Sequence, residues 1–71
     1  MNKDFKVLRT TTNSDELIFT NYHINSNGDI LNRKNESVKL TTDKEGNEYY
    51  ILMIKGRAYK KTTKELLEQN F

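Results

Sequence analysis

The stretch EYYILMIKGRAYKKTTKELLEQNF, residues 48–71, decides the fold that the sequence predicts. Its first seven residues are rich in aromatic and β-branched side chains, which favour a strand. Lys55-Gly56 then suits a two-residue hairpin turn, so that Ala58–Thr62 returns as the next strand. Thr62 or Thr63 can serve as the N-cap of a helix that follows.

The C-terminal helix is expected to pack on the sheet. Leu66, Leu67 and Phe71 fall on one side of a helix of about eight residues. A helix this short is not stable alone in water, so its apolar side needs a partner, and only the sheet can provide one. The expected fold class is therefore α+β: a small antiparallel sheet of about three to five strands with one C-terminal helix packed on one face.

The remaining sequence predicts further strands separated by polar turns. Asn25–Asp29 is a strong turn signal, because Asn and Gly tolerate the left-handed backbone conformation. A second polar turn is expected at Asp43–Asn47. The strands expected around these turns are Asp4–Arg9 with Phe5 and Val7 on one face, Tyr22–Asn25, Asp29–Arg33 with Ile30 facing inward, and Val38–Thr42.

Length and composition favour one small domain, residues 1–71. A chain of 71 residues can form one thin core. It has no cysteine, which excludes disulfides and thiolate zinc sites. Residues 1–16 contain no apolar run typical of a signal peptide, and the longest apolar run, Tyr49–Ile54, is far too short to span a bilayer. We therefore expect a cytoplasmic protein without a membrane segment.

The basic residues are concentrated near the C-terminal end. The formal net charge is only +2, but residues 49–64 contain five basic residues and no acidic residue. A local basic patch is typical of nucleic-acid binding, although lysines also protect exposed strand edges. The residues predicted to contact nucleic acid are Lys55, Arg57, Lys60, Lys61 and Lys64, with Arg33 and Lys39 as an extension of the patch.

The strand at residues 48–54 is apolar on both faces. Successive side chains of a strand point to opposite faces, so one set, Tyr50, Leu52 and Ile54, can lie under the helix. The other set then lies on the open face, where large apolar groups need cover. That cover can come from residues 5–19 through Phe5, Val7, Leu17 or Phe19, from a second subunit, or from a ligand. The residues of the open face are Tyr49, Ile51 and Met53.

The sequence offers little for catalysis. His23 is the single histidine and, without cysteines or a second histidine, it cannot build a zinc site. Asp43, Glu45 and Glu48 lie near Gly46 but lack the ligand order of a calcium loop, so a charged turn is the better interpretation. We therefore expect a protein that is not an enzyme and that uses no metal and no cofactor.

The segment YHINSNGDI, Tyr22–Ile30, resembles the signature aromatic-x-aliphatic-Ser-Asn-x-Gly-x-aliphatic of the small modular DNA-binding domains attached to HNH homing endonucleases of phages and introns. Asp4-Phe5-Lys6 stands where that family has an acidic-aromatic-basic motif. Leu66 follows Gly56 at the family's spacing, and Phe71 fits its closing aromatic residue. The departures are the order Asn25-Ser26 in the signature, and Lys64 and Glu65 at the family's His-Arg positions.

This resemblance implies a DNA-binding module of phage origin without the nuclease domain, which would contact duplex DNA without cleaving it. An alternative is a phage-encoded inhibitor that binds a host protein, such as a nuclease or a defence complex. It would use an exposed sheet edge or the apolar face formed by Tyr49, Ile51 and Met53. Either protein would act in the cytoplasm of the host cell, and a homodimer is compatible with both.

Overall fold

The computed structural model describes residues 4–71 and confirms the α+β class. Residues 1–3, which belong to the predicted domain 1–71 and to the segment inspected for a signal peptide, lie outside the described range. The elements of the described chain, in order, are β1 Lys6–Thr10, β2 Ile18–Ile24, β3 Ile30–Leu31, β4 Thr41–Thr42, β5 Glu48–Ile54, β6 Arg57–Thr62 and α1 Thr63–Asn70.

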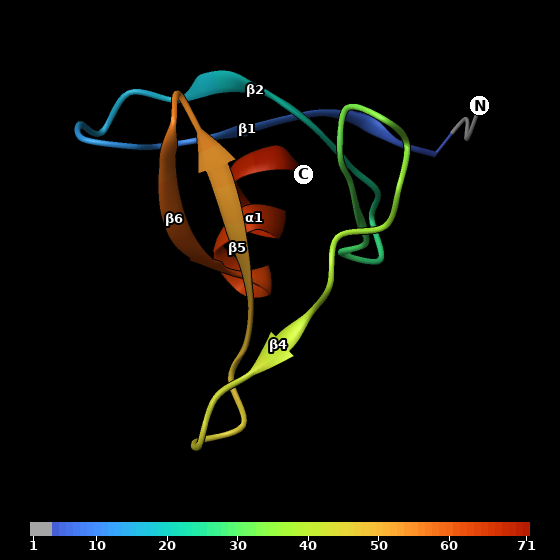
Figure 1. Ribbon diagram of the computed structural model, residues 1–71, viewed down its shortest axis with the longest axis vertical. Coiled ribbons are helices and arrows are strands. Elements are labelled where there is room, and N and C mark those ends of the chain that lie inside the picture. The colour runs from blue at the N-terminus through green and yellow to red at the C-terminus, as the bar shows by residue number, and fades with distance from the viewer. Residues whose placement is uncertain (1–3) are drawn as a thin grey trace.

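The strands form two antiparallel sheets rather than the single sheet that was predicted. The first sheet has the order β1-β2-β3 and the second sheet the order β4-β5-β6. In Figure 1, β1 and β2 cross the upper part of the molecule, β5 and β6 run crosswise to them, and α1 lies behind β5. The helix thus packs between the two sheets and contacts β1, β5 and β6.

The segment between β3 and β4 explains why there are two sheets. The N–H of Val38 donates to the carbonyl of Ile30 in the first sheet, at 2.9 Å. Only three residues later, Thr41 pairs with Tyr49 of the second sheet. A segment that leaves one sheet and joins another makes a corner between them. The predicted strand Val38–Thr42 is therefore regular only at its last two residues.

The hairpin between β5 and β6 forms at the predicted position. Lys55 and Gly56 both have positive φ, at 52° and 81°. This is the backbone that a tight two-residue turn requires, and it matches the twist of the flanking strands. Ile54 consequently pairs with Arg57, and the register continues without interruption to Tyr49 and Thr62.

Alternation along β5 sorts its side chains as predicted, and one set enters the core. Burying these side chains removes apolar surface from water, which is the main favourable term in folding. The core draws on both sheets and on the helix, so neither sheet has a separate core among the described residues. Its members are Leu8, Ile24, Ile30, Tyr50, Leu52, Ile54 and Leu66.

The face of β1 that packs against the core is not the predicted face with Phe5 and Val7. Leu8 and Thr10 are completely buried, whereas Val7 is 40% exposed. Leu8 lies two residues from Thr10, so the two share the inner face of β1, and Val7 must point outward. Phe5 precedes the strand and is half-buried.

The helix begins as predicted but ends differently. Thr62 is the N-cap, and its hydroxyl accepts the N–H of Glu65 at 3.1 Å. Leu66 is completely buried and Leu67 is half-buried. The prediction that Phe71 anchors the helix is wrong: its side chain is 58% exposed because the helix ends one residue earlier, at Asn70.

Asn70 takes the place in the interior that was predicted for Phe71. Asn70 is buried, with only 3% of its surface exposed. Its Oδ1 accepts the N–H of Arg9 at 2.8 Å, and its Nδ2 donates to the carbonyls of Arg9 at 2.9 Å and Leu66 at 2.8 Å. Since β1 is an edge strand, the carboxamide pairs with its backbone as a neighbouring strand would. This pair of bonds to Arg9, the Asn70 clamp, ties the end of the helix to the first sheet.

Replacing Asn70 with Ala should destabilise the fold strongly. The change leaves the N–H and carbonyl of Arg9 without their partners, and each unsatisfied buried group costs about 1–3 kcal/mol. We expect a loss of about 2–4 kcal/mol in the free energy of unfolding, measured by urea denaturation. Glu68→Ala is the control, because Glu68 is exposed on the same helix and should change stability by less than about 0.5 kcal/mol. Equal losses in both variants would contradict the role of the clamp.

Gly28 and Gly46 offer a matched test of packing between the β2–β3 turn and the helix. Both have positive φ, at 87° and 85°, so an Ala at either site should cost about 1–2 kcal/mol of backbone strain. A Cβ at Gly28 would also lie 2.8 Å from Cγ2 of Thr63, whereas a Cβ at Gly46 would meet nothing within 4 Å. Thermal melts should therefore show a clearly lower Tm for Gly28→Ala than for Gly46→Ala. Similar melting temperatures would mean that the turn does not pack tightly on α1.

Candidate functional site

Four exposed cations follow the hairpin, β6 and the first turn of the helix. We call this set the basic strip; its members are Lys55, Arg57, Lys60 and Lys64. Lys60 is held in place by an aromatic neighbour, since its Nζ lies 4.4 Å from the centre of the Tyr49 ring. Such a cation–π contact stabilises the ammonium position without neutralising its charge. The strip therefore presents positive charge along an edge strand of the second sheet.

The structure removes Lys61 from the predicted set of nucleic-acid contacts. Lys61 pairs across the sheet with Tyr50, which points into the core, so its side chain also starts on the inner face. The residue is only 8% exposed. Its Nζ donates to the hydroxyl of Thr11 at 3.3 Å and lies 3.6 Å from a carboxylate oxygen of Glu65. The ammonium thus bridges the β1–β2 loop and the helix.

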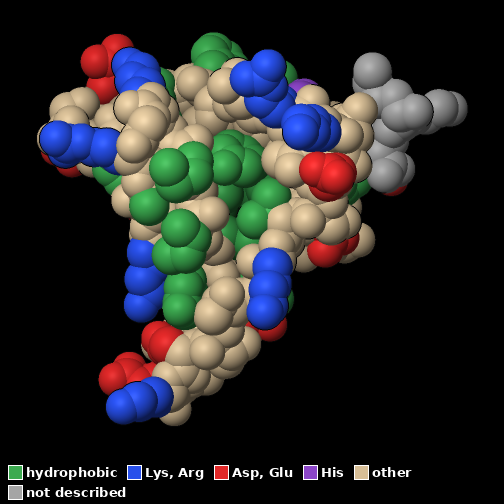
Figure 2. All heavy atoms as spheres, in the orientation of Figure 1, with side chains coloured by type: hydrophobic (Ala, Val, Ile, Leu, Met, Phe, Trp, Pro, Cys, Tyr) green, Lys and Arg blue, Asp and Glu red, His purple; other side chains and the backbone are tan. Residues whose placement is uncertain are grey.

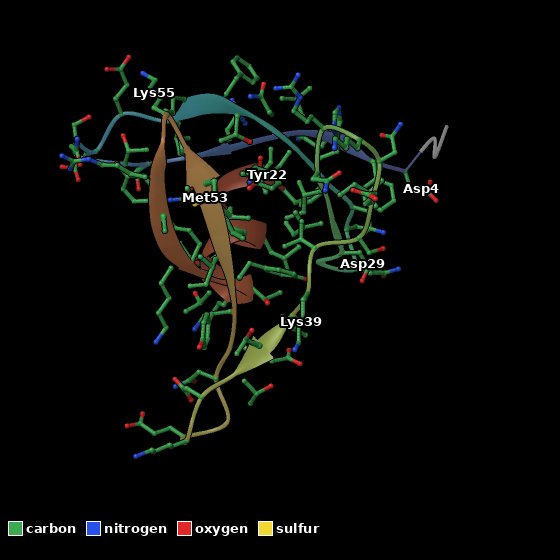
Figure 3. All side chains as sticks on the ribbon, viewed as in Figure 1. Asp4, Tyr22, Asp29, Lys39, Met53 and Lys55 are labelled. Carbon is green, nitrogen blue, oxygen red and sulfur yellow. The ribbon has the colours of Figure 1, made fainter. Side chains whose placement is uncertain are left out.

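Arg33 and Lys39 are exposed, but they lie on the connection between β3 and β4 rather than on the hairpin. Figure 3 places Lys39 and Lys55 on opposite sides of Met53. The two predicted extension residues are therefore part of a separate segment of the surface. They do not continue the basic strip along β6.

The open face of β5 is exposed, as the alternation predicts. Ile51 is 48% exposed and Met53 is 55% exposed, while Tyr49 is half-buried beneath Lys60. Figure 2 shows hydrophobic side chains exposed on the front of the molecule, with both basic and acidic side chains around them. Ala58 lies opposite Met53 on β6 and extends this surface. We call it the outer face of the second sheet.

Residues 5–19, one of the three possible covers for this face, do not cover it, since Ile51 and Met53 stay exposed. Val7 is 40% exposed and Phe19 is 72% exposed, so neither is buried against another surface. Phe19 pairs with Arg9 in the first sheet, and the Arg9 guanidinium lies 6.0 Å from the centre of the Phe19 ring. These apolar side chains belong to the outer side of the first sheet, because the inner side of β1 is taken by Leu8 and Thr10.

Tyr22 has a role that the sequence did not indicate. β4 pairs with β5 only opposite Glu48 and Tyr49, so the rest of that edge of β5 has no neighbouring strand among the described residues. The phenol of Tyr22 accepts the N–H of Met53 at 2.9 Å and caps the edge there. Figure 3 shows Tyr22 and Met53 side by side. A tyrosine in an alternating strand pattern carries no signal for such a long-range contact.

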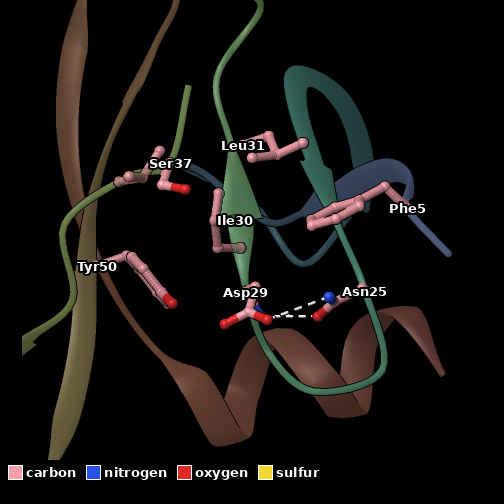
Figure 4. Close-up of a pocket in the computed structure, with 8 residues that line it drawn as sticks. Phe5, Asn25, Asp29, Ile30, Leu31, Ser37 and Tyr50 are labelled. Atoms are coloured by element: carbon pink, nitrogen blue, oxygen red, sulfur yellow. Dashed lines mark hydrogen bonds between the residues drawn. The ribbon is translucent and has the colours of Figure 1, made fainter. Parts of the chain in front are cut away.

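The hollow between β3 and β5 is shaped by turn residues that already bond to each other. It measures about 300 Å³ and is lined by the residues in Figure 4. Asn25 Oδ1 accepts the N–H of Asp29 at 2.9 Å, and Asn25 Nδ2 donates to the Asp29 carboxylate at 3.2 Å. The Tyr50 hydroxyl donates to the carbonyl of Gly28 at 2.8 Å. These groups hold the β2–β3 turn against β5, which is a structural task.

The remaining candidate residues from the sequence are His23 and the acidic residues near Gly46. His23 is half-buried in β2, and its Nδ1 has no hydrogen-bond partner among residues 4–71. The Asp43 carboxylate accepts the N–H groups of Asn47 and Glu45, each at 2.9 Å, and the bond from Asn47 is the main cause that lowers the pKa of Asp43. The described part of the chain contains no group of three or more His, Cys, Asp or Glu residues arranged to hold a metal ion.

The described part of the chain holds no helix with the length and hydrophobicity that a membrane span requires. Comparisons of the chain with protein-family models, curated proteins and solved structures find no match. The resemblance to the modular domains of HNH endonucleases therefore stays a prediction. The function has to be argued from the surfaces themselves, the basic strip and the outer face of the second sheet.

The buried Tyr50 hydroxyl should make stability depend on pH in alkaline solution. Burial, together with the negative charges of Asp29 and Glu48, raises the pKa of Tyr50 above its ordinary value of 10.0. The folded state then holds this proton more tightly than the unfolded state. Its contribution to stability is complete below about pH 10 and is lost as the pH rises through the raised pKa.

Tyr50→Phe should remove this part of the pH dependence. The variant should also lose about 1–2 kcal/mol near neutral pH, because the Gly28 carbonyl loses its donor. Urea denaturation at several pH values around 10 measures both effects. Tyr49→Phe is the control, since the Tyr49 hydroxyl has no hydrogen bond within residues 4–71 and lies on the outer face. A decline as steep in Tyr50→Phe as in the unmodified protein would rule out the proposed titration.

Proposed function

We propose that this protein is a small, non-catalytic nucleic-acid-binding module that contacts the phosphates of duplex DNA through the basic strip. One observation carries the proposal: four exposed cations follow β6, the hairpin and the helix start, and residues 49–64 contain no acidic residue. A local positive field attracts a polyanion and speeds its association. The resemblance of Tyr22–Ile30 to a DNA-binding module supports the same function.

The spacing of the strip suits a phosphate backbone. Arg57 and Lys60 are separated by three residues of strand, or about 10 Å at 3.3 Å per residue. This is about three steps along one DNA strand at 3.4 Å of helix axis each. Because Arg57 and Lys60 are three residues apart in β6, their side chains point to opposite faces of the strand. Lys55 and Lys64 extend the row at its two ends.

The neighbouring structure keeps the strip in position. Lys60 rests over the Tyr49 ring, and the buried Lys61 ties β6 to the β1–β2 loop and to Glu65. A cation that is already positioned loses less conformational entropy on binding than a free lysine. Lys61 would therefore support binding by holding β6, while its ammonium stays inside the protein.

Duplex DNA binding should weaken steeply as salt is added. Four phosphate contacts predict a slope of about −3.6 for log K against log salt concentration, from about −0.9 per contact. The quadruple variant K55A/R57A/K60A/K64A should lose most of its affinity and most of this slope. Fluorescence anisotropy with a labelled duplex at several salt concentrations measures both quantities.

A second quadruple variant, R33A/K34A/K39A/K44A, provides the matched control. Each variant removes four positive charges and lowers the formal net charge from +2 to −2. If the basic strip is the contact surface, the control should keep most of the slope. Equal losses in the two variants would show that only total charge matters, and no binding by the unmodified protein at low salt would overturn the proposal.

A further inference from the structure

A second surface of the molecule is apolar rather than charged. Tyr49, Ile51 and Met53 form a stripe along the outer face of β5, and two of them are about half exposed. Single exposed apolar residues are common on proteins, but a row of three along one strand is a continuous patch. In Figure 2, hydrophobic side chains are exposed on the front of the molecule, where β5 lies in the same view in Figure 1. Its large side chains, Tyr and Met among them, are the types enriched in protein interfaces.

The face of the second sheet is better suited to a partner than its edges. On one side, the Tyr22 phenol already accepts a hydrogen bond from the N–H of Met53 at the unpaired edge of β5. On the other side, the β1–β2 loop lies along β6, where Asn13 accepts the hydroxyl of Tyr59 at 3.4 Å. An added strand would have to break such contacts before it could pair. The outer face requires no such rearrangement.

The charges around the stripe indicate the chemistry of its partner. Lys60 pairs across the sheet with Ile51 and lies on the same face, and Lys55 lies in the hairpin turn directly after β5. A second copy of the chain stacked on this face would bring these lysines against each other, which like charges oppose. A partner with acidic side chains around an apolar centre would instead be complementary.

The spacing of the stripe fits a helix. Neighbouring stripe residues are two apart in a strand, or about 6.6 Å, and residues i and i+4 of a helix are about 6 Å apart along its axis. The opposite face of this sheet already packs against α1. We propose that the outer face of the second sheet binds an amphipathic helix of a partner protein, with its apolar side on Tyr49, Ile51 and Met53 and its acidic flanks toward Lys55 and Lys60.

A synthetic helical peptide can test this proposal with the full chain. The probe is about 18 residues long, is held helical by a side-chain lactam, carries Leu at positions i, i+4 and i+8, and has Glu on both flanks. A second peptide has Lys in place of Glu. We expect the Glu peptide to bind at least about tenfold more tightly by anisotropy, and to shift the backbone amide NMR signals of Tyr49, Ile51, Met53 and Lys60.

The double variant I51T/M53T should weaken binding of the Glu peptide by at least about tenfold, because it removes the apolar anchors. Thr keeps a high strand propensity, and both sites are exposed, so the Tm should change little. Phe19→Thr is the matched control, since it removes an exposed apolar side chain from the other sheet and should leave binding unchanged. Binding of duplex DNA by I51T/M53T should persist, which separates this surface from the basic strip.

Several outcomes would overturn the proposal. The Glu and Lys peptides could bind equally, or the NMR shifts could map to the first sheet. Loss of binding in Phe19→Thr as large as in I51T/M53T would show that any exposed apolar residue suffices. Concentration-dependent sedimentation that disappears in I51T/M53T would show that a second copy of the chain occupies the face instead.

Discussion

The whole arrangement depends on the clamp between Asn70 and the backbone of Arg9. The helix follows β6 in the chain, and its last turn is tied to the first sheet by the clamp, by Lys6, which donates to the carbonyl of Asn70, and by the Thr10 hydroxyl, which donates to Gln69. By accepting and donating at the exposed edge of β1, the Asn70 carboxamide satisfies two backbone groups that would otherwise be half-buried and unpaired. This makes α1 a shared layer between two small sheets, neither of which buries enough apolar surface to be stable alone.

With the helix packed on one side of β5 and β6, the two faces of these strands differ in burial. The inner face holds Tyr50 and Leu52 in the core and also takes Lys61, whose ammonium is paired with Glu65. The outer face is left with the exposed Ile51 and Met53, and Lys60 lies on the same face opposite Ile51. Lys60 belongs to both proposed surfaces, the basic strip and the helix-binding face. Duplex DNA and an acidic helix would then compete for one cation, which would couple their binding through the same side chain.

Local features of the sequence predicted much of the fold. β5, its hairpin, the Thr62 cap and the inward set of side chains follow from strand propensity, a left-handed turn and alternation, all of which act over a few residues. Of the predicted site residues, Lys55, Arg57, Lys60 and Lys64 are exposed as expected. The inner position of Lys61 follows from the same hairpin register, because Lys61 pairs with the inward-facing Tyr50. The burial of Asn70 and the cap by Tyr22 were not predictable, because each depends on a partner far away in the chain, Arg9 and Met53.

The sequence by itself determined the class of the fold, the position of the hairpin and the separation of charge into a basic C-terminal segment. Only the tertiary structure decided that there are two sheets, that Asn70 rather than Phe71 anchors the helix, and that no segment among residues 4–71 covers Ile51 and Met53. The reason is physical: propensity and alternation act between neighbours along the chain. A polar group can be buried only where it finds a hydrogen-bond partner, and that partner can be distant in the sequence, as the backbone of Arg9 is for Asn70.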